Sequence, residues 1–105
     1  MSADVVEELD KAVEAFEEAR KLTARESRLG VQVIAGLATV YLLLGRVGEA
    51  RNLADELIWA AQATGDTRNI AQANYMIGMV YLGEGGLEEA DRVFRTARAL
   101  AALSV

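Results

Sequence analysis

Several residue types that support catalysis or metal binding are missing from this chain of 105 residues. It contains no cysteine and no histidine, and these residues supply most zinc and copper ligands. Histidine is also the commonest general base, and cysteine is the thiol nucleophile. We therefore expect no metal ion, no other cofactor and no enzymatic activity. Because cysteine is absent, disulfide bonds give no indication of the redox compartment.

Proline, an excess of basic charge and a long apolar run are missing as well. The lack of proline suits a chain built almost wholly of helix, because proline interrupts helices. The formal net charge is −5, whereas nucleic-acid binding depends on clustered lysine and arginine. The longest apolar run, VQVIAGLATVYLLL at 31–44, is shorter than the roughly 20 residues that span a bilayer. We therefore expect no nucleic-acid or membrane partner, and a cytoplasmic protein because no secretory signal is visible.

The residues that are abundant favour helix. Apolar side chains recur with a helical period, beginning at 4–24, where Asp4 and Glu7 match a capping box. The five helices expected from this pattern cover 4–24, 28–44, 48–63, 67–82 and 87 to the C-terminus. Asp66 is placed to cap the fourth. The expected fold class is all-α, with a single domain over 1–105.

The glycine-rich stretch GEGG at 83–86 has two interpretations. A phosphate-binding loop needs free backbone amides at a helix N-terminus, followed by lysine and serine or threonine. Here Leu87, Glu88 and Glu89 follow instead, and the two carboxylates would repel a phosphate. We therefore interpret the stretch as a corner between two helices and expect no nucleotide site.

The sequence repeats itself with a period of 40 residues. VYLLLGRVGEA at 40–50 aligns with VYLGEGGLEEA at 80–90, and Gln32 aligns with Gln72. The two segments are copies of one helix–turn–helix corner. A fixed period of about 20 to 50 residues is typical of solenoids, in which stacked units bury faces that a single unit leaves open.

The repeated corner resembles the tetratricopeptide repeat (TPR), whose motif places W-x2-L-G-x2-Y on a first helix and A-x3-F on a second. The matching residues are Gly78, Tyr81, Ala90 and Phe94 in the second copy, Ala38, Tyr41 and Ala50 in the first, and Ala12 and Phe16 near the N-terminus. Ile34 and Asn74 stand where the motif has tryptophan. The resemblance implies a right-handed α-solenoid of antiparallel helix hairpins, with a half repeat at 1–26 and repeats at 27–65 and 66–105.

In this family the first helix of each repeat lines a concave groove that holds a partner protein. The resemblance therefore places these candidate residues in the groove: Gln32, Ala35, Thr39, Leu42, Leu43, Gln72, Tyr75, Met76, Met79 and Leu82. This surface contains no lysine or arginine to clamp a peptide carboxylate, whereas tyrosine and methionine suit an apolar helix. In the alternative interpretation, Tyr75, Met76 and Met79 are core residues, packed within the chain or against a second copy.

Trp59 and the two ends of the chain are further candidates for contact with a partner. If Trp59 is exposed, it is a candidate binding hot spot; otherwise it fills space beside the first helix of its repeat. The last stretch, RALAALSV at 98–105, is apolar nearly all round, and the front begins with half a repeat, so we expect both ends to lack a polar cap. Two functions remain open. One is a non-catalytic interaction module that binds a partner helix or peptide in the groove, and the other is a self-associating unit that forms homodimers or larger homo-oligomers.

Overall fold

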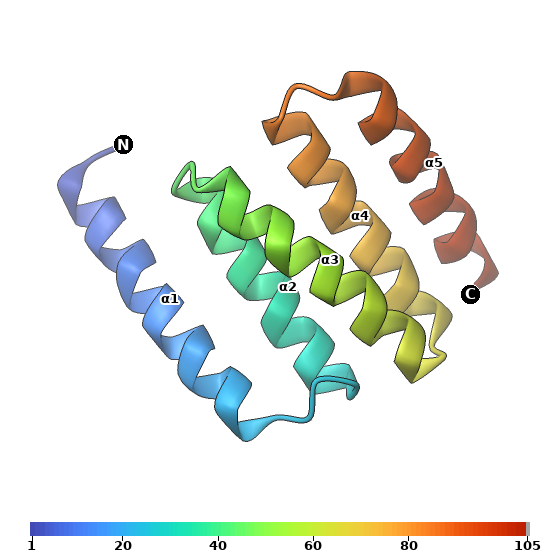
Figure 1. Ribbon diagram of the computed structural model, residues 1–105, viewed down its shortest axis with the longest axis horizontal. Helices are drawn as coiled ribbons and strands as arrows, with labels where there is room; N and C mark the ends of the chain where they lie inside the picture. Colours follow the sequence, from blue (N-terminus) through green and yellow to red (C-terminus); the bar gives the residue numbers. More distant parts are fainter. Residues whose placement is uncertain (105) are drawn as a thin grey trace.

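The computed structural model describes residues 1–104, which form five helices joined by short turns (Figure 1). The helices are α1 (Ala3–Leu22), α2 (Arg28–Leu43), α3 (Val47–Thr64), α4 (Thr67–Gly83) and α5 (Leu87–Leu103). No strand occurs in this range. The predicted fold class and the five helices are confirmed. Val105, which the sequence placed in the last helix, lies outside the described residues.

Side chains cap helices in the way the sequence suggested, with one exception. The Asp66 carboxylate accepts a hydrogen bond from the Arg68 N–H at 2.9 Å and caps α4, as predicted. For α1 the capping-box prediction is wrong. Ser2 has extended backbone dihedrals and its hydroxyl accepts from the Val5 N–H at 3.3 Å. Asp4 therefore lies inside the first turn of α1, where its charge still favours the helix N-terminus.

The two corners identified by the repeat share one backbone geometry. Gly45 and Gly85 have left-handed φ angles of 76° and 83°. The N–H of the residue after each glycine donates to a tyrosine carbonyl four residues before the glycine, Tyr41 in the first corner and Tyr81 in the second, at 2.8 Å in both. A bond of this span next to a left-handed glycine closes a helix C-terminus in the Schellman motif. The GEGG stretch is therefore a helix corner, as interpreted from the sequence.

Each helix packs against the next one along the chain, and α2 also packs against α4. Figure 1 shows the result as a row of helices with α1 at one side and α5 at the other. The main core lies where α2, α3 and α4 meet, around the fully buried Val31, Leu37, Leu57 and Ala73. This packing agrees with helix hairpins, while the right-handed twist and the repeat boundaries stay predictions.

Glycines let neighbouring helices approach each other closely at two places. A Cβ atom at Gly78 of α4 would lie only 2.4 Å from the ring of Phe94 on α5. In the same way, a Cβ atom at Gly36 of α2 would lie 2.6 Å from the ring of Phe16 on α1. An aromatic ring therefore packs directly on helix backbone at both ends of the row.

The two ends of the row differ in polarity. No residue of α1 is buried, and its exposed side chains are mainly charged: Asp4, Glu7, Glu8, Asp10, Lys11, Glu14, Glu18 and Lys21. At the other end, the large apolar side chains of Tyr75, Leu82 and Leu103 are exposed. The prediction that both ends lack a polar cap is therefore wrong for α1, because the side of α1 that faces away from α2 carries mainly charged residues. Among the described helices, none combines the length and the apolar character that a bilayer crossing requires.

Candidate interaction surface

An open apolar groove lies between α4 and α5, and we call it the α4–α5 groove. Its volume is 650 Å³, and its lining residues are Ala71, Gln72, Tyr75, Met79, Leu82, Phe94, Ala97, Arg98 and Ala101. The spacing of these residues on each helix follows the helical period, so each helix contributes one stripe. Tyr75 is 55% exposed, and its ring centroid lies 5.4 Å from that of Phe94 with the rings tilted. The two rings together form an aromatic surface in a mainly apolar groove.

Four of the residues selected from the sequence line this groove together. Gln72, Tyr75, Met79 and Leu82 follow one another at about one helical turn along α4, which places them on one face. Leu82, the last of them, is 42% exposed. The sequence left open whether Tyr75 and Met76 line a groove or belong to the core. In the structure Tyr75 is a surface residue that lines the groove, whereas its neighbour Met76 belongs to the core.

Ala35 and Met76 were expected to line a groove, but both are buried. Ala35 is 3% exposed and Met76 is 9% exposed, and both lie in the main core. They are buried because α4 packs over the face of α2 that carries Ala35. The Thr39 hydroxyl donates to the Ala35 carbonyl at 2.9 Å and lies 3.8 Å from the Met76 sulfur. The side chains of Ala35 and Met76 are therefore part of the core and are not available to a partner.

The remaining α2 candidates lie outside the α4–α5 groove. Gln32, Thr39 and Leu43 are exposed, on a stripe of α2 that does not line it. Leu42 is half-buried and packs against the core instead. The ten residues predicted to share one concave surface are therefore divided between two helices and the core.

Four lining residues on α5 were not selected from the sequence: Phe94, Ala97, Arg98 and Ala101. The family resemblance directs attention to the first helix of each repeat, and α5 is a second helix. The period of 40 residues carried a usable signal, since these residues align with Ala54, Leu57, Ile58 and Ala61. Arg98 also corrects the prediction that the surface has no basic residue.

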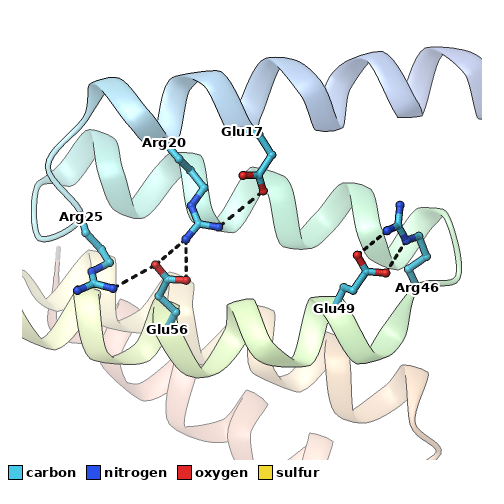
Figure 2. Close-up of polar contacts among 6 residues, drawn as sticks. All are labelled: Glu17, Arg20, Arg25, Arg46, Glu49 and Glu56. Atoms are coloured by element: carbon cyan, nitrogen blue, oxygen red, sulfur yellow. Dashed lines mark hydrogen bonds and ion pairs between the residues drawn. The ribbon is translucent and has the colours of Figure 1, made fainter.

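Trp59 lies elsewhere, on α3, and is 52% exposed. The Arg25 guanidinium lies 4.9 Å from its ring centroid, within cation–π range. Arg25 also lies 3.5 Å from a Glu56 carboxylate oxygen, and Arg20 donates to both oxygens of that carboxylate at 2.8 and 2.9 Å. Figure 2 shows Glu56 between the two arginines. Trp59 is thus exposed, as one interpretation required, but it belongs to an ionic cluster that joins α3 to α1.

A second ion pair in Figure 2 stands at the first corner. Arg46 donates to the Glu49 carboxylate at 2.6 Å, and its guanidinium lies 4.7 Å from the Tyr41 ring centroid. The hydrogen bond to Glu49 raises the pKa of the Arg46 guanidinium above its ordinary value. The pair lies within the first turn of α3, and the contact of Arg46 with the Tyr41 ring connects it to the end of α2. Across residues 1–104, no three histidine, cysteine, aspartate or glutamate side chains cluster closely enough to hold a metal ion.

No protein-family model matches this sequence, and neither does any curated protein or solved structure. The resemblance to the tetratricopeptide repeat therefore stays a prediction that rests on the repeated motif residues. Conclusions about function rest on the surface of the molecule itself.

Proposed function

We propose that this chain is a non-catalytic, TPR-like interaction module that binds a segment of a partner protein in the α4–α5 groove. The observation that carries the proposal is Tyr75, which is 55% exposed in the middle of an apolar groove. Exposed apolar patches with a polar rim mark sites of protein interaction, and aromatic anchors dominate binding energy there. The proposed location is the cytoplasm, where a chain without cysteine is indifferent to reducing conditions.

The chemistry of the lining supports recognition rather than catalysis. Gln72 and Arg98 are its polar members besides the Tyr75 hydroxyl, and no carboxylate or aliphatic hydroxyl lines the groove. An acid and a base within reach of one reacting atom are the usual requirement for proton-transfer catalysis. The groove instead combines an apolar floor with a few orienting groups, which is the arrangement of a binding site.

The test replaces Tyr75 or Met79 with glutamate and compares the proteins captured from a cell extract by each variant. Both substitutions introduce a charge into the groove and should remove the specific partner, while far-UV circular dichroism stays unchanged. Leu29→Glu is the matched control, because Leu29 is 58% exposed on α2 and does not line the groove. A partner that binds Tyr75→Glu as well as it binds the wild type would contradict the proposal.

Self-association is the second candidate function, and the exposure of Leu103 favours it. Leu103 is 77% exposed on α5, at the same end of the row as Tyr75 and Leu82 but on the side of α5 that faces away from the groove. A second copy that packs against this end would cover these apolar side chains. Light scattering over a range of concentrations measures the solution mass, and a constant monomer mass would rule this candidate out.

A further inference from the structure

We infer that the occupant of the α4–α5 groove is an amphipathic α-helix that docks there as α4 docks on α2 and α3. It presents small side chains to Tyr75 and Phe94, and a carboxylate to Arg98. The inference rests on the proposed function and names the kind of partner that the groove takes.

The precedent lies in the first repeat. At the offset of 40 residues, the lining residues Ala71, Tyr75, Phe94, Ala97 and Ala101 correspond to Val31, Ala35, Ala54, Leu57 and Ala61. All five of the corresponding residues are 3% exposed or less. α4 packs over this surface and contributes Ala73, Met76 and Val80 to the same clusters. The difference between the copies lies at Tyr75, Phe94 and Ala101, which are exposed or half-buried, whereas Ala71 and Ala97 are buried in both. These five positions thus occur twice in the chain, and a helix covers them in the first copy, while Gln32 and Thr39, which correspond to Gln72 and Met79, stay exposed beside it.

The second copy differs in the size of its side chains. Tyr75 and Phe94 stand where the first repeat has Ala35 and Ala54, so their rings occupy space that α4 fills with larger residues such as Met76 in the first repeat. Close packing requires that larger side chains on one surface face smaller side chains on the other. A helix in the α4–α5 groove therefore carries alanine, glycine or serine opposite the two rings.

The second copy also differs in charge. Arg98 corresponds to Ile58, and it forms no ion pair with any residue in 1–104. Ile58 and Ile70, which lies near the start of α4, pack against the same core cluster. We therefore assign the position of Ile70 on a docked helix as the one that meets Arg98. An acidic residue there lies in the first turns of the helix, where the helix dipole also favours negative charge.

The probe is a labelled peptide of 17 residues with the α4 sequence, carrying Ile70→Glu and Met76→Ala. A matched peptide carries Ile70→Lys in place of Ile70→Glu. Fluorescence anisotropy measures binding of each peptide to the full wild-type chain and to Arg98→Glu. The wild type should prefer the glutamate peptide by roughly fivefold, the upper range for a partly exposed ion pair, and Arg98→Glu should reverse the preference.

The size argument has its own test. A glutamate peptide that retains Met76 should bind the wild type several-fold less tightly than the Met76→Ala peptide. Tyr75→Ala opens space in the groove, so it should remove most of that difference. An unchanged difference in Tyr75→Ala would overturn the claim that Tyr75 faces this position.

Three outcomes would overturn the inference as a whole. The first is that neither peptide binds, and the second is that the wild type and Arg98→Glu do not differ in peptide preference. The third is a dimer in sedimentation that Tyr75→Glu separates into monomers, which would make a second copy the occupant. In the first two cases, the proposed function would still stand if the wild type captured a partner that Tyr75→Glu did not. The partner would then bind the groove in a form other than this helix.

Discussion

Replacing Gly78 with alanine should destabilise the protein, although alanine is the better helix former. The added Cβ atom would lie 2.4, 2.7 and 2.8 Å from three carbons of the Phe94 ring, well inside van der Waals contact. Alanine gains about 1 kcal/mol in helix propensity over glycine, whereas overpacking costs about 1–3 kcal/mol. We therefore expect the free energy of unfolding to fall by about 1 kcal/mol.

Urea denaturation followed by far-UV circular dichroism measures this change through the midpoint, provided that the slope is constant. Thermal melting gives a second reading, because 1 kcal/mol corresponds to a shift of about 4–8 °C in Tm for a domain of this size. Gly48→Ala is the control, since Gly48 also lies within a helix but no atom lies within 4 Å of its added Cβ. This control should be neutral or slightly stabilising.

The decisive comparison uses Phe94→Ala as a second background. Without the ring, Gly78→Ala should raise the free energy of unfolding by about 0.5–1 kcal/mol, as expected for alanine over glycine in a helix. The first repeat already has this pairing, with Ala38 and Ala54 at the corresponding positions. If Gly78→Ala stabilises the wild type, or has the same effect in both backgrounds, the packing argument is refuted.

Three further predictions concern other parts of the fold. Gly30→Ala should cost about 3 kcal/mol or prevent folding, because its Cβ would lie 2.0 Å from the backbone oxygen of Ala24, which cannot rotate away; the helical circular dichroism signal measures this. Leu57→Ala removes a fully buried side chain and should lower the free energy of unfolding by about 2–5 kcal/mol in urea titrations. Glu56→Gln should cost about 1 kcal/mol by weakening the part-buried contact with Arg20. Its effect should shrink in about 1 M salt, and a loss independent of salt would contradict an ionic origin.

The helices could be predicted from the sequence because their signals are local. Apolar periodicity, the capping Asp66 and the corner glycines act within a few residues, and every predicted bound lies within two residues of the observed one. The cap of α1 was the exception. Both Ser2 and Asp4 are suitable capping residues, and the choice depends on where the chain enters the helix, which composition does not reveal.

The surface was harder to predict because burial depends on which helix covers which face. Tyr75 and Met76 are neighbours with similar apolar character, yet only Tyr75 points away from the core. Arg98 and Ala101 on α5 carry no distinctive signal of their own as surface residues. Their position becomes informative only when the repeat is used to ask what covers the equivalent residues of α3.

The difference in polarity between the two ends of the row also limits how copies can assemble. Head-to-tail contacts that do not close into a ring generate filaments of indefinite length. Such growth would require α1 of one copy to enter the α4–α5 groove of the next. The outer face of α1 is mainly charged, and burying those charges in an apolar groove is unfavourable. The charges on α1 therefore disfavour head-to-tail growth through this particular contact.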